Sequence, residues 1–212
     1  MESQRAAVSL IGITGGSGSG KTELIKQLRP LFTEDQVCVL SQDNYYRARS
    51  VQEIDDHGFE NFDVPTALDL DTFRRDVIKL REGKAVVRPE YAYNDVQSEA
   101  RELVVNPASI VVIEGLFVFA DCVLRDLVDF KIYVHARDNL KVIRRVRRDR
   151  RERNYPVDAV LHRYEHHVMP AYDQFVAPYR ENADIVINNN QNFDKGLEML
   201  AGFFKSRLQA QR

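Results

Sequence analysis

The chain has 212 residues, of which 44% are hydrophobic and 29% are charged, and its formal net charge is −2. This length and composition are typical of a soluble globular protein with one domain and a sizeable core. The small net charge speaks against a protein drawn to nucleic acid or anionic membranes by its overall charge.

Three features of the sequence favour the cytoplasm. No apolar run reaches the length of a transmembrane helix. The N-terminus lacks the apolar core of a signal peptide, because polar Ser9 and a glycine-rich stretch interrupt its hydrophobic residues. The cysteines Cys38 and Cys122 both lie among apolar residues, where we expect them to be buried in a reducing compartment. We therefore expect a cytoplasmic protein without membrane contacts.

A glycine-rich stretch follows the first predicted strand. The apolar run at residues 8–14 is typical of a buried parallel strand, and a helix is expected to run from the stretch to Arg29, where Pro30 ends it. The sequence between them is Gly15, Gly16, Ser17, Gly18, Ser19, Gly20, Lys21 and Thr22. It matches the pattern G-x-x-x-x-G-K-[ST] of the phosphate-binding P-loop, in the strand–loop–helix context that this motif requires.

The P-loop pattern predicts how a polyphosphate would be held. The glycines let successive backbone N–H groups point at the phosphates, and the following helix adds the positive end of its dipole. Lys21 supplies a point charge for the β- and γ-phosphates, and the hydroxyl of Thr22 is placed to bind Mg²⁺.

A short strand, an irregular stretch, a helix and a β-hairpin are predicted after the P-loop helix. Residues 37–40 form a second short apolar run, and residues 44–68 are polar, aromatic and irregular, which indicates a functional loop in a compact domain. A helix capped by Asp69 or Asp71 follows. Residues 84–105 then predict a β-hairpin inserted into the chain.

The second half of the chain alternates strands and helices. Strands are predicted at residues 110–113, 130–134 and 185–187, and helices at residues 116–128, 139–153, 157–176 and 194–208. Asp138 is expected to cap the arginine-rich helix at 139–153, and Pro170 is expected to kink or split the helix that follows.

This pattern predicts an α/β fold. The short, continuously apolar strands indicate a P-loop NTPase-type doubly wound parallel sheet in a single domain, residues 1–212. The predicted domain also contains a small inserted β-hairpin at 84–105 and a helical lid region at 139–180. Ligands of such sheets bind beyond the carboxyl ends of the strands, so residues at these ends are the candidates for chemistry.

Two acidic residues follow predicted strands. Asp43 comes just after the strand at 37–40, where its carboxylate would bind Mg²⁺, accept the proton of an attacking hydroxyl, or simply begin a turn. Glu114 ends the strand at 110–113, and four apolar residues followed by an acid form the Walker-B pattern that holds Mg²⁺.

Two further clusters stand out. The helix at 139–153 carries seven arginines, some of which would clamp a transferring phosphoryl group, with Arg145 and Arg148 on one face. A nucleic-acid-binding helix is the alternative, although it usually accompanies a basic domain. The histidines at 162, 166 and 167 include an i, i+4 pair, but Arg163 stands where the H-E-x-x-H zinc motif has its glutamate, so packing or surface roles are expected.

The chain resembles the uridine (uridine–cytidine) kinase family over about residues 8–188. The matching stretches, besides the P-loop and Glu114-Gly115, are Ser41-Gln42-Asp43-Asn44-Tyr45-Tyr46, Asn61-Phe62-Asp63-Val64-Pro65, Pro89-Glu90-Tyr91-Ala92-Tyr93, the arginine-rich run 144–153 and the two stretches 169–178 and 183–187. The ordered set is far more specific than any one of these motifs.

The resemblance implies an enzyme that transfers the γ-phosphate of ATP or GTP to the 5′-hydroxyl of a pyrimidine nucleoside. It implies that Asp43 is the base, assisted by Lys21 and Arg148. Thr22, Glu114 and Asp43 would serve Mg²⁺. Phosphate contacts would come from Arg145, Arg148 and Arg153, and Asp63 would hold the ribose hydroxyls. The nucleoside pocket would be lined by Tyr46, Phe62, Tyr91 and Tyr93. Members are often homo-oligomers.

The chain departs from the family pattern on the acceptor side. Val64, Ala92, Val96 and Arg163 stand where the family has a histidine, an aspartate, a second histidine and a glutamine. These replacements leave open a different acceptor, a sugar phosphate or a pantothenate-like acid, with Arg163 as partner of an anionic group. A third alternative, from another class, is a nucleotide-dependent RNA-binding or regulatory protein that uses the arginine helix.

Overall fold

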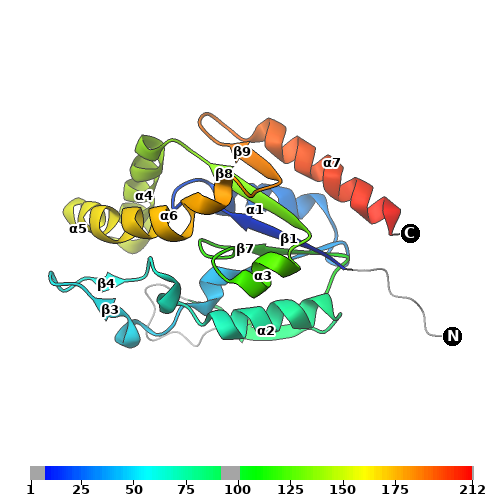
Figure 1. The fold of residues 1–212 in the computed structure, drawn as a ribbon, viewed down its shortest axis with the longest axis horizontal. Coiled ribbons are helices and arrows are strands. Elements are labelled where there is room, and N and C mark those ends of the chain that lie inside the picture. Colours follow the sequence, from blue (N-terminus) through cyan, green and yellow to red (C-terminus); the bar gives the residue numbers. More distant parts are fainter. Residues whose placement is uncertain (1–7, 92–100, 212) are drawn as a thin grey trace.

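The computed structural model describes residues 8–91 and 101–211. A five-stranded parallel sheet forms its centre, as predicted (Figure 1). Its strands, in spatial order, are β2 (Val37–Ser41), β7 (Ile110–Glu114), β1 (Ser9–Thr14), β8 (Phe130–His135) and β9 (Ile185–Asn188). The P-loop follows β1, the central strand, so strands on both sides of it end beside the loop.

Helices cover both faces of the sheet because its central strands are apolar on both faces. On one face, α1 (Lys21–Leu28) and α7 (Asp194–Ala210) pack against side chains such as Ile11. On the other face, α2 (Leu70–Arg81) and α3 (Cys122–Leu127) pack against side chains such as Leu10. Consecutive residues of β1 thus enter opposite cores, as the two-residue period of a strand requires.

Three helix predictions need correction or refinement. Asp69, and not Asp71, caps α2, because its side chain accepts a hydrogen bond from the Thr72 amide at 3.0 Å. Asp138 lies inside α4 (Asp138–Arg153) and pairs with Lys141, so it does not cap this helix. The helix predicted at 116–128 is limited to α3, so half of that range is irregular.

The predicted hairpin is present as β5 (Val86–Pro89) paired antiparallel with β6 (Glu102–Val105). A second small ribbon was not predicted: β3 (Glu53–Ile54) pairs with β4 (Glu60–Asn61) inside the irregular stretch. Its strands are too short for a periodicity signal.

The helices of the predicted lid lie beyond the carboxyl ends of the strands (Figure 1). They are α4, α5 (Val157–Arg163), a π-helical turn (Tyr164–Val168) and α6 (Met169–Phe175). The helix predicted at 157–176 is therefore interrupted by the π turn, and Pro170 stands in the first turn of α6. Short 3₁₀ helices span Arg29–Leu31, Gln42–Tyr45, Arg49–Val51, Pro65–Ala67 and Ala177–Arg180.

The two cysteines and the character of the helices remain to be compared with the predictions. Cys38 is buried, as predicted, but Cys122 is exposed because it lies in the first turn of α3 on the solvent side. Within residues 8–91 and 101–211, none of the helices combines the length and the apolar character needed to cross a bilayer.

Candidate active site

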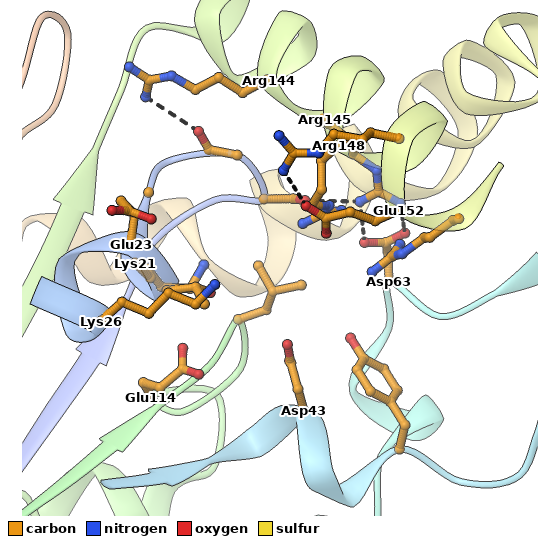
Figure 2. Close-up of a pocket in the computed structure, with 18 residues that line it drawn as sticks. Lys21, Glu23, Lys26, Asp43, Asp63, Glu114, Arg144, Arg145, Arg148 and Glu152 are labelled. Atoms are coloured by element: carbon orange, nitrogen blue, oxygen red, sulfur yellow. Dashed lines mark hydrogen bonds and ion pairs between the residues drawn. The ribbon is translucent and has the colours of Figure 1, made fainter. Parts of the chain in front are cut away.

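A cavity of about 440 Å³ lies at the carboxyl ends of β1, β2 and β7, under α4. Figure 2 shows arginines of α4 on one side of it and the carboxylates of Asp43 and Glu114 on the opposite side. The predicted site residues that line it are Ser17, Gly18, Gly20, Lys21, Thr22, Asp43, Tyr46, Asp63, Glu114, Arg145, Arg148 and Arg153. Residues from five separate parts of the sequence therefore meet at one place.

The P-loop needs glycine for both backbone conformation and space. Gly18 and Gly20 have φ values of 78° and 102°, in the left-handed region that other residues rarely adopt. A Cβ atom on Gly20 would lie 2.2 Å from the Nδ2 atom of Asn189. Asn189 holds the loop by donating a hydrogen bond to the Ser19 carbonyl at 2.8 Å. The remaining loop residues Gly15, Gly16 and Ser19 are buried and do not line the cavity.

Lys21 is the cation at the base of the cavity. Its ammonium group donates to the Gly15 carbonyl at 2.7 Å, so it is held against the loop that would cradle a phosphate. Burial lowers the pKa of Lys21, while the charges of Glu114 and Asp43 act in the opposite direction. Phosphate oxygens would provide the negative charge that this buried ammonium requires.

The strand register places an acidic centre opposite Lys21. Ser41 and Glu114 are direct partners in the β2–β7 pairing, and the Ser41 hydroxyl donates to Oε1 of Glu114 at 2.5 Å. Burial and the nearby charge of Asp43 raise the pKa of Glu114 to about 7. Asp43 itself is exposed, at the start of the 3₁₀ helix after β2.

These donors fit a hard divalent cation. The ionised form of buried Glu114 is disfavoured beside Asp43, so a bound cation would stabilise both carboxylates. Thr22 lines the same cavity. Carboxylate and hydroxyl oxygens are the ligands that such cations prefer over nitrogen or sulfur.

The arginine helix faces the cavity through a buried network. Arg145 donates to both carboxylate oxygens of Asp63, at 2.9 and 3.0 Å, and to the Ser17 hydroxyl at 3.0 Å. Asp149 lies 2.8 Å from Arg148 and 3.3 Å from both Arg145 and Arg153. One buried aspartate thus gathers the three arginines that were predicted to bind phosphate.

Aromatic side chains form the acceptor side. Tyr46 lines the cavity, and its ring centroid lies 5.8 Å from that of Phe62 and 5.5 Å from that of Tyr91. The Tyr91 amide donates to the Asn44 side chain at 3.2 Å, which ties the end of β5 to this wall. The prediction for Tyr93 lies outside the described residues, as do Ala92 and Val96.

Arg163 lies outside the cavity and, unlike Phe62 and Tyr91, has no ring contact with Tyr46 among the contacts of the described residues. Its guanidinium lies 4.4 Å from the ring centroid of Phe59 and 4.8 Å from that of Tyr155. It also approaches Glu60 at 3.8 Å and donates to the Ala159 carbonyl. An acceptor-binding role for Arg163 stays a prediction, one that requires this cluster to rearrange.

Three contributors were not predicted. Ser41 fixes Glu114, Asp149 gathers the arginines, and Arg144 donates to the Asn189 carbonyl at 3.0 Å above the P-loop. The signal for Ser41 was its place two residues before Asp43 at a strand end. Asp149 was identifiable as the one acid within the arginine run 144–151, since buried arginines need a counter-charge.

The comparisons with known proteins agree with this geometry. Residues 10–194 match the model of the "Phosphoribulokinase / Uridine kinase family". The chain is 36% identical over 181 residues to a uridine kinase of Staphylococcus aureus (strain JH9), covering 85% of this chain and 87% of that protein. It is 33% identical over 192 residues to a uridine kinase of Limosilactobacillus reuteri (strain DSM 20016), covering 91% and 88%.

A solved structure supports the fold alone. A putative fructose transport system kinase from Silicibacter sp. TM1040 has a TM-score of 0.66 at 18% identity, covering 88% of this chain and 92% of that one. The phosphate loop, the acidic centre and the matched length together lead to one conclusion: the chain belongs to the phosphoribulokinase/uridine kinase family.

Proposed function

We propose that the protein transfers the γ-phosphoryl group of ATP to the 5′-hydroxyl of uridine or cytidine. The observation that carries this proposal is the cavity that places Lys21, the Asp43–Glu114 acidic pair and the arginines of α4 around one space. Relatives of 33% and 36% identity, named uridine kinase, support a nucleoside as the acceptor.

Each half of the cavity has a separate task. The P-loop amides and Lys21 hold the β- and γ-phosphates, and Arg148 and Arg153 neutralise charge on the transferring group. Thr22, Glu114 and Asp43 are the residues that would hold Mg²⁺, which neutralises phosphate charge when bound. GTP is the alternative donor, because no contact among the described residues distinguishes adenine from guanine.

Asp43 is the proposed base on the acceptor side. It is exposed to the cavity and lies close enough to Glu114 and Lys21 to perturb their pKa values. A carboxylate at this place can accept the proton of an attacking hydroxyl as the phosphoryl group is transferred in line. Tyr46, Phe62 and Tyr91 form the wall against which the acceptor base would stack.

The alternatives are less well supported. Arg163, which suggested an anionic acceptor, is already engaged by Glu60 and two aromatic rings. Arg145, Arg148 and Arg153 converge on Asp149 and line the cavity instead of forming an outward basic face. This arrangement favours phosphate binding inside the cavity over an RNA surface.

An acceptor panel tests the proposal. The purified chain would be incubated with ATP and Mg²⁺ and with uridine, cytidine, ribulose 5-phosphate, pantothenate or no acceptor, while ADP release is followed. ADP release stimulated by uridine or cytidine, with the 5′-monophosphate as product, supports the proposal. A clear preference for the sugar phosphate or the acid would overturn the nucleoside assignment. Release that no acceptor stimulates, combined with salt-sensitive RNA binding, would favour the regulatory alternative.

A further inference from the structure

A second cavity, of about 340 Å³, lies between the β3–β4 ribbon and the lid helices. Nitrogen and oxygen ligands concentrate there, because His57, His162, His166 and His167 line it together with Asp55. Four of the five histidines of the chain thus surround one space. None of these residues lines the first cavity, so the proposed kinase chemistry leaves the cluster unexplained.

Three side chains converge closely within this cluster. The Oδ2 atom of Asp55 lies 2.8 Å from Nε2 of His162 and 2.9 Å from Nε2 of His167. One potential ligand atom from each of the three residues lies within 4.8 Å of the other two. Ligand atoms around a tetrahedral zinc ion are about 3.3 Å apart. The two oxygen–nitrogen separations would therefore lengthen by about half an ångström, and the two histidine nitrogens would adjust from a separation of at most 4.8 Å.

The π-helical turn explains how the two histidines meet. Residues five apart in a regular α-helix point about 140° away from each other. The turn at Tyr164–Val168 widens the helix to an i→i+5 repeat, which brings residues 162 and 167 to the same face. The i, i+4 spacing of a regular α-helix would pair His162 with His166 and not with His167, but the side chain of His166 is exposed.

Backbone amides orient the Asp55 carboxylate through its other oxygen. The Oδ1 atom of Asp55 accepts hydrogen bonds from the amides of His57 and Phe59, at 2.9 and 2.8 Å. These bonds fix the carboxylate and leave Oδ2 to face the histidines. Orientation of a ligand by hydrogen bonds to its other atom is a feature of built metal sites.

We propose that Asp55, His162 and His167 form a binding site for a divalent transition metal of the zinc class. Two imidazoles and one carboxylate suit zinc better than Mg²⁺, which prefers oxygen ligands. The ring centroid of His57, which also lines this cavity, lies 4.6 Å from that of His162, so His57 or a water could complete the coordination.

The bound metal would connect two parts of the acceptor side. Asp55 belongs to the segment between β3 and β4, which continues through Asn61 to Asp63 in the first cavity. The histidines belong to α5 and the π turn of the lid region. A metal bound by both would hold the segment that carries Asp63 against the lid, and would raise the thermal stability of the folded chain.

The experiment measures zinc binding by the full chain without nucleotide. The protein is stripped with a chelator, dialysed into buffer with excess Mg²⁺ to fill oxygen-ligand sites, and titrated with Zn²⁺ against a chromophoric competitor. We expect one zinc ion per chain and a higher melting temperature with zinc. His162→Gln and His167→Gln should each weaken binding by at least about 100-fold, beyond the loss typical of outer-shell changes.

Matched variants keep this test decisive. His135→Gln removes the one histidine outside the cluster and should bind zinc as the unaltered chain does. Circular dichroism of the metal-free variants separates lost ligands from lost folding. Because His→Gln retains a hydrogen-bonding side chain, Asp55 keeps a partner. The proposal is overturned if the unaltered chain binds no zinc, or if both cluster variants bind it as tightly as His135→Gln.

Discussion

Arg145 of the lid helix and Asp63 of the acceptor segment form a two-pronged ion pair, with N–O distances of 2.9 and 3.0 Å. Both side chains are buried, at 6% exposure for Arg145 and 8% for Asp63. The guanidinium of Arg145 also contacts Ser17 of the P-loop. One arginine therefore connects the loop that would bind phosphate with the aspartate that would bind the acceptor.

Breaking this pair should destabilise the fold. Asp63→Asn leaves Arg145 with an uncompensated share of buried charge, although Asp149 remains 3.3 Å away. We expect the free energy of unfolding to fall by about 2 kcal/mol, measured by urea denaturation. The control is Glu82→Gln, which removes an exposed ion pair with Lys84 and should have no measurable effect. Equal stability of both variants would contradict the role of the pair.

Removing the Ser41 hydroxyl should change the pH dependence of activity. This hydroxyl donates to Glu114 and lowers the pKa of its carboxyl, against burial and the charge of Asp43, which raise it. In Ser41→Ala the acidic limb of the pH–activity profile should move to higher pH by about one unit. The exposed Ser206→Ala is the control. An unshifted profile would show that Ser41 does not act through Glu114.

Glu114→Gln should gain stability where it loses activity. The pKa of Glu114 is raised from 4.5 to about 7. The protonated form therefore stabilises the fold below pH 4.5, and this contribution is lost as pH rises to about 7. Glutamine does not ionise. Without Mg²⁺ and nucleotide, the free energy of unfolding of the variant at pH 8 should exceed that of the unaltered chain by on the order of 2 kcal/mol.

The decisive measurement is how the stability difference between Glu114→Gln and the unaltered chain depends on pH. Thermal melts at pH 5 and pH 8 should show a small difference at the lower pH and a large one at the higher pH. A difference that is the same at both values would mean that ionisation of Glu114 is not its cause.

Tyr46→Ala should affect the acceptor alone. Tyr46 lines the cavity and contacts Phe62 and Tyr91, so its loss removes the centre of the aromatic wall. Stacking of a base on an aromatic ring contributes about 1–3 kcal/mol, which predicts a rise of roughly 10–100-fold in KM for uridine. Steady-state kinetics should show an unchanged KM for ATP. Tyr46→Phe, which keeps the ring, should behave as the unaltered chain; a KM raised equally in both variants would refute stacking.

The sequence identified the sheet and the donor half of the site because both depend on local patterns. The apolar runs of β1 and β7 are continuous, and the P-loop is a contiguous motif. Asp43 and Glu114 were placed by one general rule, that ligands of parallel sheets bind at the carboxyl ends of strands. Their meeting in the cavity follows from the register that pairs Ser41 with Glu114.

The features that the sequence did not reveal depend on long-range contacts or rare geometry. Arg145 and Asp63 are 82 positions apart, and no local pattern indicates their ion pair. The β3–β4 ribbon has two residues in each strand, too few for an alternation. The π turn changes the helical repeat, so the spacing of His162 and His167 had no recognisable meaning. Arg163 had a plausible partner in an anion, but local aromatic rings and Glu60 engage it.

The most direct test of the proposed mechanism is turnover by Asp43→Asn. If Asp43 accepts the proton of the acceptor hydroxyl, kcat with ATP and uridine should fall by about 10²–10⁴-fold, while the Kd for ATP stays within about threefold. Asp126→Asn, an exposed site on α3, should leave both constants unchanged. A kcat near that of the unaltered chain would contradict the assignment of Asp43 as the base.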